Sequence, residues 1–257
     1  MNLTPLCECR CKSRVGASCM TKNSSLSHSV TNDLRQDIVS GALEPGAWLK
    51  TESLAERYGV SANPVREALW RLQGEGFVVA NPNQGARVRV VDEDFVRNIF
   101  EIREALEPLI MHRFCGRATS ADIARLREAA AVFAEIASRK APSFLALDGA
   151  NKAFHAIITG GEFNAQALEV MDRYARLINA TRAKLPISLA SLRQRVRQHD
   201  EIIDAIVSGD ADRAAAVASA HVRAAGEDML TQMRQVRTST ARAAAAELSV
   251  PSRSGKR

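Results

Sequence analysis

The sequence predicts a mainly α-helical protein with two folded parts, a small domain of three helices and a β-hairpin followed by an all-α helical bundle. Apolar residues recur every three or four positions over most of the chain, which is typical of amphipathic helices. Strict alternation of apolar and polar residues is confined to one short segment before residue 91. The 257 residues suffice for two modest domains, which we expect at 29–91 and 92–235.

The formal net charge of +6 lies at the two ends of the chain. Residues 1–28 carry +3 and residues 236–257 carry +4, whereas the two expected domains are together close to neutral. We expect 1–28 to be a disordered tail and 236–257 a flexible one, although the Ala-rich piece 241–248 could prolong the last helix. Net charge alone therefore does not identify a DNA-binding protein.

The expected location is the cytoplasm, with no membrane partner. No stretch approaches the roughly 18–20 apolar residues of a membrane span, and the N-terminus lacks the apolar core of a signal peptide. Four cysteines, Cys7, Cys9, Cys11 and Cys19, lie in the first twenty residues. They could hold a soft metal. We favour instead a flexible N-terminal extension, or a start codon assigned too far upstream, with Met20 as the true first residue.

The first two helices are marked by their apolar spacing and their ends. Val30, Leu34 and Ile38 predict a helix from Val30 to about Ser40, which Gly41 ends. Thr51 can cap a short second helix that stops at Gly59, a residue type that tolerates the left-handed conformation after a helix end.

The third helix and a β-hairpin complete the N-terminal domain. Ser61 is a good N-cap for a helix that breaks at Gly74-Glu75-Gly76. Phe77-Val78-Val79 predicts one strand, and Val88 and Val90, alternating with two arginines, predict the next. Three helices and a hairpin in this order describe a winged helix-turn-helix.

In such a fold the second helix of the motif presents its N-terminal residues to the major groove. Asn63 can pair with adenine, and Arg66 can bind guanine or phosphate. Gly85 at the wing tip allows close backbone approach, and Arg87, with Arg89 behind it, would meet phosphate. The arginines could equally be solvated surface charges, and Asn63 could simply start the helix. The DNA-binding candidates are Thr51, Ser61, Asn63, Arg66, Gly85 and Arg87, with Ala62 and Trp70 as further reading positions.

The run Gly59-Val60-Ser61 followed by Pro64-Val65-Arg66-Glu67-Ala68-Leu69 resembles the N-terminal domain of GntR-type bacterial transcription regulators. The family usually has an Arg-Thr pair after Gly-Val-Ser, and that Arg often reads a guanine. This chain has Ala62-Asn63 instead. The loss of a bidentate Arg–guanine pair removes about 1–3 kcal/mol of discrimination, so we expect an atypical half-site.

From Asp92 to about Met233 the pattern is helical throughout, with caps or breaks near Thr119, Pro142, Gly160-Gly161, Pro186 and Gly209. Asp92 caps the first of these helices. Its expected apolar stripe is Phe95, Ile99, Ile102, Leu106, Leu109 and Ile110. The segment therefore predicts an all-α domain.

Three of the five histidines lie in periodic helical segments of this domain. Asn151 and His155 share one helix face at i, i+4, so both could reach one ion. His199 and His221 lie on two later helices separated by the Gly209-Asp210 turn, and antiparallel packing could bring them together.

These segments resemble the FCD ligand-binding domain of the FadR branch of the GntR superfamily. Glu101-Ile102-Arg103, Leu106-Glu107-Pro108 and Asn151-Lys152-Ala153-Phe154-His155 carry the resemblance, with His199-Asp200-Glu201 and His221. In metal-carrying FCD domains the matching positions are an acidic residue and three histidines. The resemblance thus implies a divalent metal ion, Zn²⁺, Ni²⁺ or Mn²⁺, on Asn151, His155, His199 and His221. The neutral Asn151 amide binds such an ion less strongly than a carboxylate would.

Other interpretations of the same residues remain open. The three histidines could be hydrogen-bonded in an apolar core. Arg103 could clamp an effector carboxylate or pair with Glu107. Arg195 is a weaker cavity candidate, and His112 and Cys115 are expected spectators.

The preferred hypothesis is a transcriptional regulator, most simply a repressor and not an enzyme. As a homodimer it would bind double-stranded operator DNA under the control of a small organic acid held in the C-terminal domain. One alternative is a metal-dependent hydrolase with Asp200 or Glu201 as base, but the chain lacks a His-Glu-x-x-His motif. Another is a nucleic-acid adaptor with a purely structural helical domain.

Overall fold

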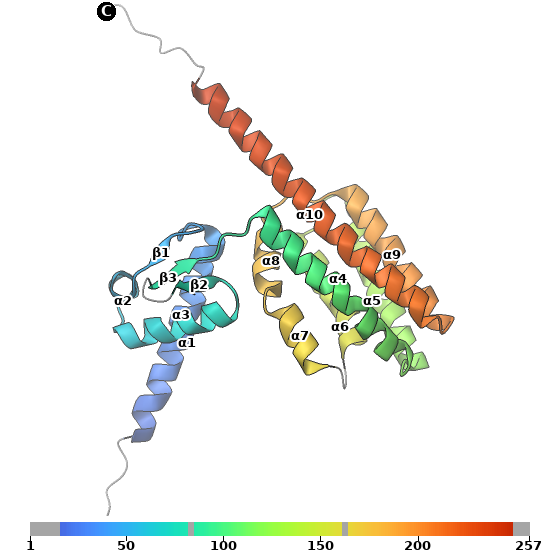
Figure 1. Cartoon of the computed structure of the whole chain (residues 1–257), viewed down its shortest axis with the longest axis horizontal. Helices are drawn as coiled ribbons and strands as arrows, with labels where there is room; N and C mark the ends of the chain where they lie inside the picture. The colour runs from blue at the N-terminus through green and yellow to red at the C-terminus, as the bar shows by residue number, and fades with distance from the viewer. Residues whose placement is uncertain (1–15, 82–84, 161–163, 249–257) are drawn as a thin grey trace, which may run out of the picture. The chain divides into compact units, whose positions relative to one another are not determined.

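The computed structural model describes residues 16–81, 85–160 and 164–248 (Figure 1). The chain forms two compact units, one ending at Arg89 and the other starting at Val90. The mainly α fold class is as predicted. None of the described helices combines the length and the apolar character that a membrane-spanning helix needs.

The N-terminal unit has three helices and a three-stranded antiparallel sheet of order β1-β3-β2. Phe77 ties the sheet to the helices, because its amide donates to the carbonyl of Leu72 at 2.9 Å and its ring is buried. Leu34, Val65 and Leu72 are buried as well. The elements are α1 (Gly16–Ser40), β1 (Trp48–Leu49), α2 (Thr51–Tyr58), α3 (Ala62–Gly74), β2 (Val78–Asn81) and β3 (Gly85–Val88). The winged helix-turn-helix is therefore present.

Helix α1 begins earlier than expected. The predicted tail of residues 1–28 is wrong for residues 16–28, which are helical, while residues 1–15 lie outside the described chain. Ser27 and Thr31 are both buried, and the Thr31 hydroxyl donates to the Ser27 carbonyl at 2.6 Å. The buried Thr31 hydroxyl is thus satisfied within its own helix.

Two details of the motif also differ from expectation. Thr51 is the first residue of α2 rather than its cap, and Lys50 occupies the N-cap position without a side-chain bond. Ser61 does hold the extended N-cap position of α3, but its hydroxyl makes no cap bond. Strand β1 was missed, because two residues are too few to show alternation, and Val90 lies beyond the end of β3.

The C-terminal unit is all-α. Asp92 caps its first helix as predicted, accepting a bond from the Phe95 amide at 2.8 Å, and Thr119 forms a capping box with Asp122. Helices α4 and α10 lie side by side, and α5 packs on α6 and α9 (Figure 1). The helices are α4 (Glu93–Cys115), α5 (Ser120–Ser138), α6 (Phe144–Thr159), α7 (Ala165–Asp172), α8 (Ala175–Arg182), α9 (Leu189–Val207) and α10 (Ala211–Leu248).

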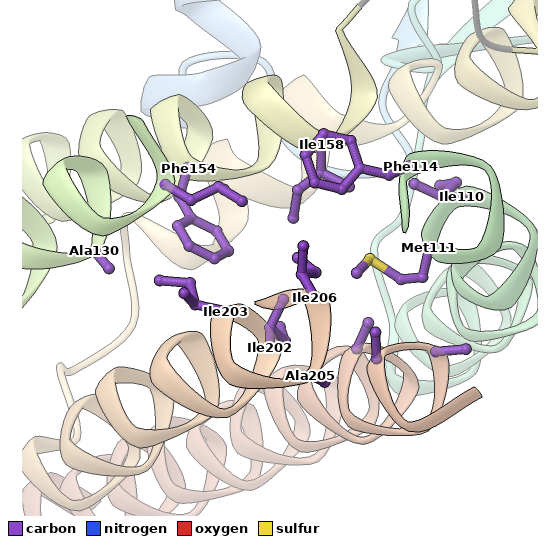
Figure 2. Close-up of a cluster of buried hydrophobic side chains, with 14 residues drawn as sticks. Ile110, Met111, Phe114, Ala130, Phe154, Ile158, Ile202, Ile203, Ala205 and Ile206 are labelled. Carbon is purple, nitrogen blue, oxygen red and sulfur yellow. The ribbon is translucent and has the colours of Figure 1, made fainter. Parts of the chain in front are cut away.

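The largest apolar cluster of this unit joins α4, α5, α6, α9 and the start of α10. Figure 2 shows Phe114 and Ile110 of α4 facing Ile158 of α6 and Ile206 of α9. The predicted stripe of α4 is partly wrong, since Ile102 and Leu109 are 43% and 37% exposed. The helix packs on α10 as well as on α6, so its buried surface is wider than one stripe and includes Val96, Phe100, Glu107, Met111 and Phe114.

The predicted flexible tail of residues 236–257 is wrong for residues 236–248, which continue α10, and residues 249–257 lie outside the described chain. Alanine has the highest helix propensity, and the segment is Ala-rich. Arg234 and Arg237 also hold this helix to α4 through Glu93, at 2.7 and 2.9 Å.

Candidate functional site

The exposed face of α3 carries the predicted reading residues. Val65, Leu69 and Leu72 anchor the opposite face in the core. Ser61, Asn63 and Arg66 point to solvent, and Arg66 Nη1 donates to Asn63 Oδ1 at 3.1 Å. Trp70 is 71% exposed. The exposed side chains of this face are therefore accessible to another molecule.

The wing places its two arginines differently. Arg87 is exposed and its guanidinium lies 5.7 Å from the centre of the Trp48 ring on β1. Arg89, predicted to back it at phosphate, instead donates from Nε to the Gly76 carbonyl at 2.6 Å and braces the sheet. Gly85 starts β3 with a φ of +89°, a conformation that favours glycine. Residues 82–84 lie outside the described chain.

In the C-terminal unit, α6, α9 and α10 bring His155, His199 and His221 together; we call them the histidine triad. Their ring centres are 5.1–5.8 Å apart, and one nitrogen of each lies within 4.8 Å of the others. Among the described residues, the triad is the group of His, Cys, Asp or Glu side chains that meets this condition for a metal ion.

All three imidazoles are held in the neutral form. Burial, followed by the charge of Arg195, lowers the pKa of His199 to about 3. Burial and then the neighbouring histidine lower the pKa of His155 well below its usual value, and the same two causes act on His221. Neutral imidazole is the form that binds a metal.

The unpartnered atoms of this region fit a cation better than a hydrogen-bonded core. Among the described residues, the buried side-chain atoms without a hydrogen-bond partner are Asn151 Oδ1 and both ring nitrogens of His199. His221 Nδ1 contacts Gln198 Oε1 at 3.1 Å, which leaves its Nε2 free to bind. Since buried polar atoms are rarely left unsatisfied, the three histidine nitrogens could hold a divalent cation, and Asn151, one turn before His155 on α6, is the oxygen that could join them.

A cavity of about 430 Å³ adjoins the triad, with Asn151 and His155 in its wall. Its cationic side chains are Arg103, Lys152, Arg182 and Arg195, and its acidic ones are Asp148, Asp172 and Asp228. Lys152 pairs with Asp148 at 2.5 Å. The wall therefore has one positive charge in excess.

Arg103, Arg182 and Arg195 form what we call the arginine cluster. The guanidinium groups of Arg103 and Arg182 lie 5.4 and 5.7 Å from the centre of the same Phe100 ring. Arg182 also donates to the Ala225 carbonyl at 2.7 Å. Burial, then Arg195 and Arg103, lower the pKa of Arg182 to about 9, so these like charges repel one another inside the cavity.

The predicted alternative partner of Arg103 was Glu107. The ion pairs of the described residues do not include one between these two side chains. Glu107 is buried, and burial raises its pKa to about 7 against the attraction of Arg103. Arg103 is thus available to a ligand in the cavity.

The remaining metal candidates lie apart from this site. His112 Nε2 contacts Asp212 at 2.8 Å and its Nδ1 contacts the Pro108 carbonyl. Burial raises the pKa of the Cys115 thiol, which disfavours the thiolate that binds metals. Cys7, Cys9 and Cys11 lie outside the described residues, as does the side chain of Cys19.

Sequence reasoning missed Arg182 and the group that faces it. Asp228 accepts bonds from Ser191 Oγ and from Gln232 Nε2, and all three line the cavity. The available signal was weak: Arg182 lies one turn after buried Ile178 in α8, where a further apolar residue would be expected.

A winged helix-turn-helix joined to an all-α unit defines a two-domain transcription regulator. Residues 26–88 match the gntR family of bacterial regulatory proteins, and residues 98–224 match the FCD domain. The chain is 31% identical over 185 residues to the Nta operon transcriptional regulator of Aminobacter aminovorans, covering 72% of this chain and 85% of that one. The chain therefore belongs to the GntR family, whose members bind operator DNA.

Two further comparisons agree with this assignment. The HTH-type transcriptional repressor RspR of Escherichia coli is 26% identical over 203 residues, which cover 79% of this chain and 87% of the repressor. The solved structure of E. coli McbR/YncC has a TM-score of 0.59 at 25% identity, covering 81% of this chain and 98% of that one. These relatives are transcription regulators, which fits a non-enzymatic protein and gives the hydrolase alternative no support.

Proposed function

We propose that this regulator acts as a repressor whose hold on operator DNA is controlled by a small organic acid in the C-terminal cavity. The observation that carries the proposal is the cavity itself. It combines an excess of positive charge, which attracts carboxylates, with unsatisfied nitrogen and oxygen atoms that would hold a cation. The repressor role is supported by the relatives named as repressors.

DNA would be bound by the exposed face of α3 and by the wing. Asn63 and Arg66 would contact base edges and Arg87 would contact phosphate, since all three side chains are exposed. Asn63 Oδ1 already accepts from Arg66, so its amide NH₂ is the group left to donate to a base. Thr51 and Ser61, at the starts of α2 and α3, have hydroxyls not used in caps, and Gly85 allows the wing backbone to approach closely.

A divalent ion, Zn²⁺, Ni²⁺ or Mn²⁺, would be held by His155, His199, His221 and Asn151. The ion would supply a positive charge that accepts a carboxylate oxygen of the effector. The chain's own part is to orient the ligands. Gln198 fixes the ring of His221, and Phe154 stacks on His199 at 4.1 Å between centres. Arg103, which lines the same cavity, would bind the effector carboxylate.

Control of DNA binding follows from linkage between the two units. An effector shifts the regulator only if it binds the DNA-competent and the released conformations with different affinities. We propose a homodimer, because two winged helices on two half-sites give enough phosphate contacts for specific binding. Its place of action would be the cytoplasm, where bacterial DNA lies.

The proposal is tested with the purified full chain and fragments of its own upstream region. We expect a retarded complex at low ionic strength that weakens steeply as salt rises, together with about one divalent ion per chain after reconstitution with Zn²⁺ or Ni²⁺. Arg66→Ala should weaken the complex, whereas Arg139→Ala, an exposed arginine of the C-terminal unit, should not. The absence of a retarded fragment would overturn the proposed DNA binding. The absence of retained metal in every preparation would overturn the proposed metal site.

A further inference from the structure

The exposed face of α3 combines polar with apolar side chains. Asn63, Arg66 and Trp70 lie at i, i+3 and i+7, so they share one face of the helix over two turns. All three are exposed, and Ala62, at the start of the helix, is partly exposed. Asn63 and Arg66 can form hydrogen bonds to base edges, but the methyl group of Ala62 and the indole carbons of Trp70 cannot. These two residues therefore need a different kind of contact.

A groove of about 540 Å³ lies between α3 and the β-sheet, and Trp70 forms part of its wall. Apolar side chains of the sheet, among them Trp48 and Ala86, line the same groove. Arg66 lines it as well, and the Arg87 guanidinium lies 5.7 Å from the centre of the Trp48 ring. Positive side chains beside an apolar wall suit a polyanion that also presents an apolar group, and duplex DNA is such a polyanion.

In the major groove of DNA, the apolar group that identifies a base is the 5-methyl group of thymine. We propose that Ala62 and Trp70 recognise thymine by burying this methyl group, so that T·A base pairs specify the half-site at both contacts. The assignment rests on the proposed binding of operator DNA by α3. At 1.5 Å per residue the two side chains are about 12 Å apart along the helix axis, which spans at most about three to four base-pair steps. They therefore contact different base pairs.

The apolar nature of the contact gives it two measurable properties. Burial of one methyl-sized group raises affinity about four-fold. The contact neutralises no phosphate and releases no counterion, so its share of the affinity should not depend on salt. Both properties distinguish it from the contacts of Arg66 and Arg87.

Replacement of thymine by deoxyuridine tests the proposal, because it removes the methyl group and leaves the Watson–Crick edge unchanged. The probe is a labelled duplex from the upstream fragment that the full chain retards, prepared once with thymine and once with deoxyuridine throughout. We expect the thymine duplex to bind about four-fold more tightly for each methyl group contacted, with the same ratio at two salt concentrations. Equal affinities would overturn the inference and leave the proposed DNA binding standing, whereas failure to retard any duplex would overturn both.

Variants locate the contact. Trp70→Ala should weaken the thymine duplex much more than the deoxyuridine duplex, which reduces their ratio to the part that Ala62 contributes. Trp70→Phe should keep part of the difference, since a phenyl ring also packs on a methyl group. Leu145→Ala removes a 78% exposed apolar side chain of the C-terminal unit and is the matched control, which should keep the full ratio. If Trp70→Ala weakens both duplexes equally, Trp70 contacts the sugar–phosphate backbone and the inference is wrong.

Fluorescence reports the same contact directly. The chain has two tryptophans, so Trp48→Phe leaves Trp70 as the single emitting indole. We expect its emission to shift to shorter wavelength when the thymine duplex binds, because an indole that is 71% exposed is then removed from water. Emission that stays unchanged at saturating duplex would contradict a contact between Trp70 and thymine.

Discussion

His199 has the least satisfied side chain in the described chain. Its ring stacks on Phe154 and meets the edge of Phe133, yet neither of its nitrogens has a hydrogen-bond partner. A protein usually avoids this arrangement, because an unmade buried hydrogen bond costs about 1–3 kcal/mol. The arrangement becomes favourable once a cation uses one of the nitrogens.

This gives a prediction that separates a metal site from an ordinary core histidine. His199→Phe should leave the metal-free chain as stable as the parent or about 1 kcal/mol more stable, since an aromatic ring replaces unsatisfied nitrogens. The same change should abolish the rise in melting temperature on adding Zn²⁺, which at a hundred times Kd reflects about 2.7 kcal/mol. Differential scanning calorimetry measures both, with His112→Phe as the exposed control. A metal-free variant weakened by several kcal/mol that keeps its zinc response would contradict this account.

Glu107 makes the stability of the folded chain depend on pH. Its pKa is raised to about 7 by burial, so the folded chain keeps a proton that the unfolded chain releases above its usual pKa near 4.5. Stability from this carboxyl is therefore complete below pH 4.5 and is lost as pH rises toward 7. Between pH 5.5 and 7 the loss amounts to about 2 kcal/mol.

Glu107→Gln should remove this loss. In urea unfolding, the free energy of unfolding of the variant minus that of the parent chain should rise by about 2 kcal/mol between pH 5.5 and pH 8. The titration of the histidines is the same in both proteins and cancels in this difference. A difference that stays constant over this range would mean that Glu107 is ionised in the folded state at pH 5.5.

Ala62-Asn63 stands where the family resemblance leads us to expect an Arg-Thr pair. An arginine there would reach a guanine, so Ala62→Arg should gain a guanine preference of about 1–3 kcal/mol at one base pair. Selection from random DNA, run on both proteins, shows the change directly. If the parent chain already selects that guanine as its main determinant, the atypical half-site expected from Ala62-Asn63 is wrong.

Among the helices, the contact of α4 with α10 depends on Gly226. A Cβ there would lie 2.8 Å from Cγ of Phe100, whose ring is buried and also holds Arg103 and Arg182. The absence of a side chain thus lets the two helices approach and positions the arginine cluster. Glycine within a helix otherwise costs up to about 1 kcal/mol.

Gly226→Ala should therefore destabilise the chain by about 1–3 kcal/mol through overpacking, in spite of the better helix propensity of alanine. Gly149→Ala is the matched control, because Gly149 lies in α6 with open space around it and should gain about 0.5–1 kcal/mol. Chemical unfolding of the two variants gives the comparison. Equal stabilisation by both would show that α4 and α10 can separate at no cost.

Single elements also show what the sequence could and could not predict. The cap at Asp92 and the three helices of the N-terminal unit were predictable, because caps and apolar spacing are local signals. Ile102 and Leu109 were misplaced because α4 packs on more than one neighbour, and no single spacing describes such a helix. Arg182 was missed because its partners, Phe100 and Ala225, are 82 and 43 residues away in the chain.

Considered as a whole, the chain separates two tasks. The N-terminal unit carries the exposed residues that suit a duplex, and the C-terminal unit encloses the charged cavity. The histidine triad was expected from the family resemblance, and the structure brings its members together; the role of the triad stays a prediction. Regulation requires that the state of the cavity alter the free energy of DNA binding in the dimer.

The most direct test of this claim measures the coupling in both directions on the metal-loaded full chain. Fluorescence anisotropy gives the Kd for a labelled upstream fragment with and without saturating succinate, and calorimetry gives the Kd for succinate with and without that fragment. The account predicts that both constants change by the same factor, about 5- to 150-fold, because coupling is reciprocal. If succinate binds and the DNA affinity stays the same, the cavity does not control the DNA-binding unit.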